Sequence, residues 1–66
     1  MEIQLNGEKT TVQEKITVVE LIEHLGLSGR RVAIECNSEI IPRDRHAQHQ
    51  LATGDRVEVV QFVGGG

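Results

Sequence analysis

Residues 16–27, ITVVELIEHLGL, decide how the chain folds, because they predict a helix with both of its ends marked. Thr17 and Glu20 have the spacing of a capping box, in which each side chain accepts a hydrogen bond from the other residue's backbone amide. Gly26 stands where a residue in the left-handed conformation ends a helix. We therefore expect a helix over roughly residues 18–25.

The apolar side chains of this helix recur at intervals of three and four residues, which places them on one face. They are Val18, Leu21, Ile22 and Leu25. Ile16 can extend this face as a hydrophobic staple on Leu21, and Leu27 can fold back onto Ile22. A helix with a single apolar face must bury it, so we expect the helix to pack on one side of a sheet.

The residues before the helix predict a β-hairpin. Residues 1–5 alternate apolar and polar side chains, which is the pattern of a half-buried strand. Asn6-Gly7 is the strongest short hairpin signal, because a type I′ turn needs positive φ at both central residues. A two-residue turn places Ile3 opposite Thr10, so Thr10 and Val12 should share the apolar face.

The residues after the helix predict three more strands. We expect them at residues 32–36 with Val32, Ile34 and Cys36 inward, at residues 39–41 before Pro42, and at residues 56–61 with Val57 and Val59 inward. Residues 43–50 are polar and irregular, with room for one helical turn, and Leu51 should anchor them to the core. This order predicts an α+β domain, a mixed sheet of four to five strands with one main helix on one face.

Length and charge argue against several classes of function. The 66 residues make one small domain, which buries only about 60% of the surface of its unfolded chain, so we expect no deep substrate cavity and no enzyme. The formal net charge of −3 and a lone aromatic residue argue against a nucleic-acid or membrane partner. A single cysteine excludes an internal disulfide, and no apolar run has the length of a signal peptide or membrane span. We expect a cytoplasmic protein.

The sequence ends in Gly64-Gly65-Gly66, directly after the last expected strand. Glycine lacks a Cβ and loses the most entropy when ordered, so we expect residues 63–66 to be a flexible tail on a domain of residues 1–62. Such a tail fits a narrow channel and presents the α-carboxylate of Gly66 as a chemical handle. The alternative is a disordered terminus or a remnant of a cleaved fusion.

Val60, Phe62 and Val63 place bulky apolar side chains beside this tail. Val60 must face outward if Val57 and Val59 face inward, because successive side chains of a strand point to opposite faces. Exposed apolar clusters often mark a partner surface, which is the role we expect for these three residues. The alternative is that Phe62 folds back over the edge of the sheet.

Other reactive side chains have weaker functional patterns. Cys36 is expected on the inward face, where a buried thiol is usually inert, so we do not expect it to carry sulfur or act in redox chemistry. His46 and His49 are three residues apart in a polar segment, where we expect them to be solvated. A structural metal site needs four ligands, and the sequence offers no cysteine pair or third clustered histidine, so we expect no metal.

Five short motifs recur in one known family at this length. They are Met-x-Ile-x-Leu-Asn-Gly at residues 1–7, where x is any residue, TVVELI at 17–22, IIPR at 40–43, GDRV at 54–57, and the final Gly65-Gly66. In these motifs the chain resembles the sulfur carrier proteins of thiamine biosynthesis (ThiS type), which belong to the ubiquitin-like β-grasp family. Relatives often have a large aromatic residue shortly after the Pro-Arg pair, where this chain has His46, and Gly64 extends their usual glycine pair.

The resemblance implies a β-grasp fold in which the last strand is central and parallel to the first. It also implies a carrier with no catalytic residue of its own and no bound cofactor. An E1-like adenylyltransferase would use ATP to adenylate the Gly66 carboxylate, with Gly64 and Gly65 threaded into its site. Sulfur from a persulfide donor protein would then give a C-terminal thiocarboxylate, and a thiazole synthase would accept the sulfur.

Three alternatives use the same fold differently. The small subunit of molybdopterin synthase shares the fold and tail, but that family usually has a longer chain. A ubiquitin-like modifier would join Gly66 to a lysine amine of another protein, and with only Lys9 and Lys15 its self-chains would be restricted. A pure interaction module would leave the glycine ending without a purpose.

Overall fold

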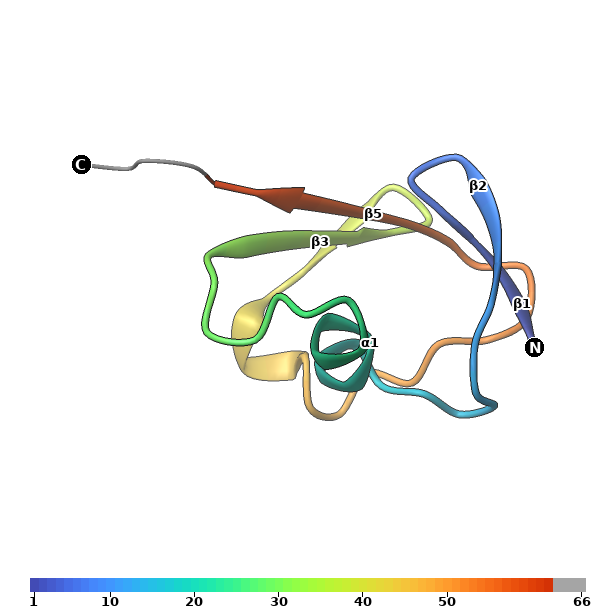
Figure 1. Cartoon of the computed structure of the whole chain (residues 1–66), viewed down its shortest axis with the longest axis horizontal. Helices are drawn as coiled ribbons and strands as arrows, with labels where there is room; N and C mark the ends of the chain where they lie inside the picture. The colour runs from blue at the N-terminus through green and yellow to red at the C-terminus, as the bar shows by residue number, and fades with distance from the viewer. Residues whose placement is uncertain (63–66) are drawn as a thin grey trace.

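Five strands and one α-helix build the chain in the computed structural model, which describes residues 1–62 (Figure 1). The elements are β1 (Glu2–Leu5), β2 (Glu8–Thr11), α1 (Val18–His24), β3 (Val32–Cys36), β4 (Glu39–Ile41), the 3₁₀ turn η1 (Arg43–Arg45) and β5 (Arg56–Gln61). The predicted α+β class and the predicted strands are therefore confirmed. The expected tail, residues 63–66, lies outside the described residues.

The strands form one mixed sheet in the order β2-β1-β5-β3-β4. The central strand β5 is parallel to β1 and antiparallel to β3, as the β-grasp resemblance implied. Asn6 extends the contact between β1 and β5, because its amide donates to the Val57 carbonyl at 2.9 Å and its Oδ1 accepts from the Val59 amide at 2.8 Å. The β1 side therefore restrains the first part of β5, up to Val59, and β3 pairs with it from Val57 to Gln61.

The β1–β2 hairpin has the predicted turn and register. Asn6 and Gly7 have φ values of 50° and 83°, which are the positive angles that a type I′ turn requires. Ile3 lies opposite Thr10, and the Val12 amide donates to the Met1 carbonyl at 2.8 Å. Val12 is buried, so the hairpin contributes its apolar side to the core as expected.

The predicted caps hold both ends of α1. The Thr17 amide donates to Glu20 Oε1 at 2.9 Å, and the Glu20 amide donates to Thr17 Oγ1 at 3.2 Å, which completes the capping box. At the other end Gly26 has a φ of 74°, and the Leu27 amide donates to the Ile22 carbonyl at 3.0 Å. This is the hydrogen bond of a Schellman motif, which satisfies a carbonyl that the helix leaves free.

One residue of the predicted apolar face is not buried. Leu25 is the C-cap of α1 and is 36% exposed, whereas Val18, Leu21 and Ile22 are buried. The Schellman turn returns the chain to the helix at Leu27, which packs against the core instead. The helix therefore ends one residue earlier than predicted, and its buried face is one residue shorter.

The core lies between α1 and one face of the sheet. Its buried members are Ile3, Val12, Ile16, Val18, Leu21, Ile22, Ile34, Cys36, Leu51 and Val57. Leu51 anchors the segment before β5, as predicted, and its amide donates to the Ile16 carbonyl at 2.8 Å. Helix, hairpin and sheet thus share a single core.

The polar segment that follows β4 is more ordered than we predicted. His46 is only 7% exposed, and its Nε2 lies 3.0 Å from the carbonyl oxygen of Ile41, to which it donates because a carbonyl can only accept. The carbonyls of His46 and His49 accept from the amides of Val19 and Val18, each at 3.0 Å. The first amides of a helix have no partner within it, so this segment supplies the partners. The expectation of a solvated His46 was wrong.

Hydrogen bonds also fix the start of β5. Asp55 accepts from Asn37 Nδ2 at 3.0 Å and from the Ala52 amide at 2.8 Å, and the Arg56 amide donates to Asn37 Oδ1 at 2.9 Å. Burial alone would raise the pKa of Asp55, but the hydrogen bonds from Ala52 and Asn37 outweigh it and lower the pKa. The Asn37 and Asp55 side chains thereby join the β3–β4 turn to the turn that leads into β5.

We expect Thr17→Ala to lower the free energy of unfolding by about 1 kcal/mol, because it leaves the Glu20 amide without its side-chain acceptor. Urea denaturation monitored by circular dichroism measures this change. Thr17→Ser keeps the hydroxyl and should stay close to the wild type. Equal losses in the two variants would attribute the effect to the threonine methyl group and contradict the capping role.

Candidate functional site

The outer face of the sheet is open on the side opposite the helix. Figure 1 shows α1 and η1 on the same side of β3 and β5, with no described element over the other side. A sheet that is covered on one face normally presents polar side chains on the other. Apolar side chains on the open face are therefore candidates for a binding role.

Three large apolar side chains are exposed on or beside this face. Ile40 is 72% exposed on β4, Val60 is 53% exposed on β5, and Phe62 is 58% exposed directly after β5. We call these three residues the outer apolar surface. Val60 lies opposite the small residue Ala33, and Ile40 lies opposite the polar residue Glu35. These neighbours on β3 leave the side chains of Val60 and Ile40 exposed.

The outward direction of Val60 was predicted correctly. With more than half of its side chain in contact with solvent, Phe62 does not fold back to cover the sheet edge, as the alternative required. Its amide donates to the Arg31 carbonyl at 2.9 Å, which holds the residue beside the start of β3. Val63, the third predicted partner residue, lies outside the described residues, as do Gly64, Gly65 and Gly66.

Ile40 is the member of this surface that the sequence analysis missed. The available signal was the pair Ile40-Ile41 within one short strand, since adjacent strand residues point to opposite faces. Ile41 packs against the core, and Ile40 therefore points outward. A shallow hollow of about 60 Å³ runs between Ile40 and Val60, and Glu35 and Glu58 also line it.

Cys36 lies inward, as predicted, and is 6% exposed. Burial, followed by the negative charges of Asp55 and Glu39 and a hydrogen bond with Asp55, raises the pKa of its thiol to about 11. The thiol is therefore protonated near neutral pH, and a protonated thiol is a poor nucleophile. This environment is the reverse of the one that activates a sulfur-transfer cysteine.

Within residues 1–62 no three His, Cys, Asp or Glu side chains come together as a metal site would require. His46 uses its Nε2 in the bond to Ile41. In the same residues, no helix has both the length and the apolar character needed to cross a membrane.

Comparison with known proteins gives a consistent family assignment. A model described as the ThiS family matches residues 2–66. The sulfur carrier protein ThiS of Escherichia coli is 33% identical over 66 residues, which is 100% of both chains. The crystal structure of a thiamine biosynthesis protein (ThiS) from Geobacter metallireducens superposes with a TM-score of 0.85 at 33% identity and covers 100% of both chains.

Some relatives are much longer than this chain. A protein of Paramagnetospirillum magneticum named thiazole synthase is 41% identical over 66 residues, and the chain spans 20% of its length. The similarity therefore concerns one segment of that protein.

We expect alkylation of Cys36 by iodoacetamide to be slow in the folded protein at about pH 8. A pKa near 11 instead of 9.0 leaves about a hundredfold less thiolate. The rate should rise with a midpoint near 11 in the folded chain and near 9.0 in urea. A midpoint below neutral pH in the folded chain would return Cys36 to consideration as a sulfur-carrying group.

Proposed function

The chain belongs to the ThiS family, and we propose that it is the sulfur carrier for formation of the thiazole ring of thiamine. One observation carries the proposal: the chain aligns from end to end with a sulfur carrier protein, and the alignment includes the glycine residues after β5. The outer apolar surface beside those residues supports it, since a carrier must bind the enzymes that load and unload it.

Activation would begin at the carboxylate of Gly66. An α-carboxyl group has an unperturbed pKa of about 3.3–3.7, so it is ionised at neutral pH and can attack the α-phosphorus of ATP. The products are an acyl-adenylate and pyrophosphate, formed in the site of an E1-like adenylyltransferase. AMP is a good leaving group, whereas the oxygen of a free carboxylate is not.

Sulfur would enter by displacement of AMP. The terminal sulfur of a persulfide on a donor protein attacks the acyl carbon and forms an acyl disulfide. A second thiol then cleaves the S–S bond, which releases the Gly66 thiocarboxylate and leaves the donor as a disulfide. The raised pKa of Cys36 and its burial argue against its serving as the donor thiol.

Glycines would let the tail reach the adenylylating site. A side chain at residues 64 or 65 would widen the channel that the tail requires, and a wider channel would admit water to the reactive acyl-adenylate. All catalytic groups come from the partner under this proposal. The chain is a cosubstrate, and it binds no cofactor of its own because ATP is held by the activating enzyme.

The rigid attachment of β5 gives the tail a defined starting point. β5 is hydrogen-bonded to β1 and β3, and the Phe62 amide is bonded to the Arg31 carbonyl. A partner that grips the outer apolar surface therefore fixes the point from which the glycines extend. Such pre-organisation lowers the entropy cost of placing the carboxylate in the partner's site.

We propose a thiazole synthase as the enzyme that accepts the sulfur. Support comes from the protein of that name in Paramagnetospirillum magneticum, which contains a segment 41% identical to this chain. A segment similar to this chain within one such enzyme is consistent with use of a separate carrier by another. The E1-like adenylyltransferase and the persulfide donor complete the proposed set of partners, all of them cytoplasmic.

We expect the wild-type chain, incubated with the host's adenylyltransferase, ATP and a persulfide source, to gain the mass of one oxygen-to-sulfur exchange at Gly66. Deletion of Gly65 and Gly66 should abolish this gain, because the shortened tail no longer reaches the site. Intact-protein mass spectrometry with fragmentation measures both results.

Thermal unfolding of the deletion variant is the control and should match the wild type, since the deletion leaves every core residue within residues 1–62 in place. An unmodified wild-type terminus would contradict the proposal. Attachment of Gly66 to a lysine of another protein would favour the modifier function instead.

We expect Phe62→Ala and Ile40→Ala each to weaken binding to the adenylyltransferase by about tenfold, because exposed anchors of this kind dominate interface energies. Isothermal titration calorimetry measures the dissociation constants. Leu25→Ala is the matched control, since Leu25 is also partly exposed (36%) but is the C-cap of α1. Equal affinities for all three variants and the wild type would remove the outer apolar surface from the interface.

A further inference from the structure

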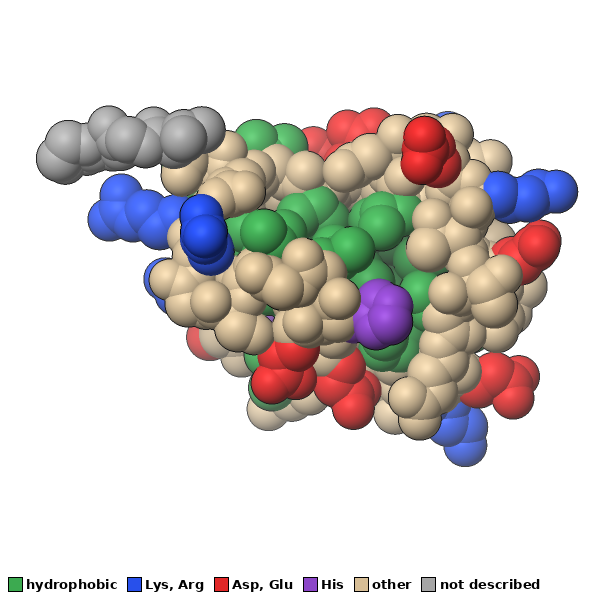
Figure 2. Space-filling view, in the orientation of Figure 1, with side chains coloured by type: hydrophobic (Ala, Val, Ile, Leu, Met, Phe, Trp, Pro, Cys, Tyr) green, Lys and Arg blue, Asp and Glu red, His purple; other side chains and the backbone are tan. Residues whose placement is uncertain are grey.

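Positive side chains surround the point where the described chain leaves the sheet. Arg31, Val32, Arg43 and Phe62 line a hollow of about 220 Å³ at the end of β5. A second hollow of about 360 Å³ between α1 and η1 shares Val32 and Arg43 with it and also includes Arg30. Figure 2 shows Lys or Arg side chains at this end of the molecule, and others at the opposite end.

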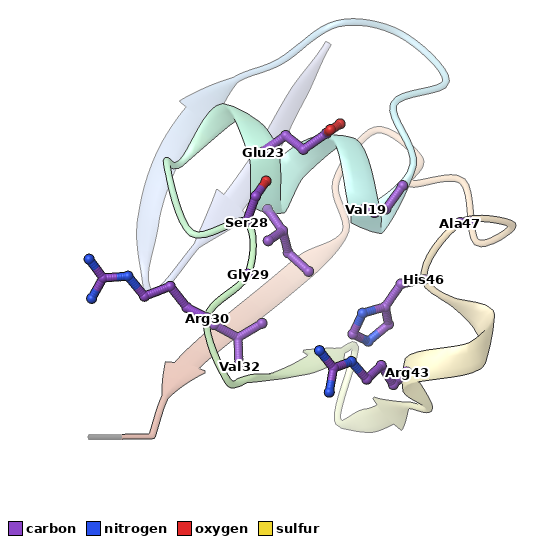
Figure 3. Close-up of a pocket in the computed structure, with 10 residues that line it drawn as sticks. Val19, Glu23, Ser28, Gly29, Arg30, Val32, Arg43, His46 and Ala47 are labelled. Atoms are coloured by element: carbon purple, nitrogen blue, oxygen red, sulfur yellow. The ribbon is translucent and has the colours of Figure 1, made fainter. Parts of the chain in front are cut away.

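Backbone interactions fix the positions of these arginines. Arg31 accepts the hydrogen bond of the Phe62 amide at 2.9 Å, so its backbone is tied to the base of the tail. Arg43 opens η1, and its carbonyl accepts from the amide of the buried His46 at 3.2 Å. In Figure 3 the Arg43 side chain extends from η1 toward β3 beside the His46 ring.

The local charge is opposite to the charge of the whole chain. The sequence has a formal net charge of −3, with seven basic residues against ten acidic ones. Among the described residues that line the two hollows, Glu23 is the single carboxylate, and it lies on α1, away from Phe62. Glu35 and Glu58 lie opposite each other further back on the outer face. The described residues that line the hollow beside Phe62 thus include two arginines and no carboxylate.

The hydrogen bonds within residues 1–62 involve Arg31 and Arg43 through their backbones. Arg31 and Arg43 have exposed side chains, and the interactions that tie them to the fold are made by their backbones. An exposed guanidinium presents several N–H donors in a planar fork that matches a carboxylate. Overall negative charge disfavours nucleic acid and anionic lipid as occupants, which leaves acidic protein side chains as the fitting chemistry.

We propose that Arg31 and Arg43 bind an acidic segment of the activating partner and so orient the base of the tail toward the adenylylating site. The inference rests on the proposed function and adds to it the chemistry of the partner surface. The apolar contact through Phe62 would supply affinity for the partner, and the two arginines beside it would set the orientation of the bound carrier. Charge complementarity of this kind mainly raises the association rate and rejects wrong orientations.

The test is steady-state pyrophosphate release by the host's adenylyltransferase, measured against carrier concentration at low and at high salt. We expect Arg31→Glu and Arg43→Glu each to raise KM for the carrier by about tenfold at low salt, with little change in kcat. The difference should shrink at high salt, because exposed charges are screened. Arg31→Gln and Arg43→Gln remove the charge without reversing it, so they should raise KM for the carrier less than the glutamate variants do.

Arg56→Glu is the matched control, since Arg56 is an exposed arginine at the opposite end of β5. It should leave KM close to the wild-type value, and circular dichroism should show all variants folded. If Arg31→Glu and Arg43→Glu raised KM for the carrier no more than Arg56→Glu does, the inference would be overturned. A raised KM for ATP instead of the carrier would assign the arginines to nucleotide phosphates and would also overturn it. Absence of pyrophosphate release with the wild type would contradict the proposed function itself.

Discussion

β5 forms backbone hydrogen bonds with β1 on one side and with β3 on the other, and the remaining structure is arranged around this double pairing. The first and last strands of the chain are thereby joined in parallel, which closes the fold over the intervening helix. Asn6 reinforces the parallel side through its own bonds to Val57 and Val59. Since β5 leads directly to Phe62, the same pairing that completes the core also sets where the tail begins.

Coverage of only one face of the sheet produces the candidate binding surface. The apolar face of α1 packs against inward residues such as Ile3, Ile34 and Val57, each no more than 1% exposed. Truncation of buried side chains of this size typically lowers the free energy of unfolding by about 2–5 kcal/mol, so stability requires these residues. The residues that alternate with them on the strands face outward and are not required for the core. Val60 is therefore available for a partner because its neighbours already satisfy the core.

Residues 43–50 show how one segment can have two tasks. Their carbonyls satisfy the first amides of α1, and burial of His46 holds the segment against the helix. The same attachment presents Arg43 beside Phe62. A small domain has few residues to spare, so the segment that caps the helix also shapes the surface around the tail.

Much of the local structure could be predicted from the sequence. The Asn6-Gly7 turn, the capping box of Thr17 and Glu20 and the end of the helix near Gly26 all appeared as expected, because each depends on residues close together in the chain. Strand alternation likewise placed Val60 outward and Cys36 inward. The strand order came from the family resemblance and not from any pattern in the residues.

The sequence by itself thus determined the turns, the caps, the strand faces and the family to which the glycine ending belongs. Only the tertiary structure decided that His46 is buried, that Leu25 is exposed, and that Ile40 stands on the same open side of the sheet as Val60. It also decided that Arg31 and Arg43 line the same hollow as Phe62. The physical reason is that these outcomes depend on contacts between segments far apart in the chain, for which hydrophobic periodicity and turn chemistry carry no information.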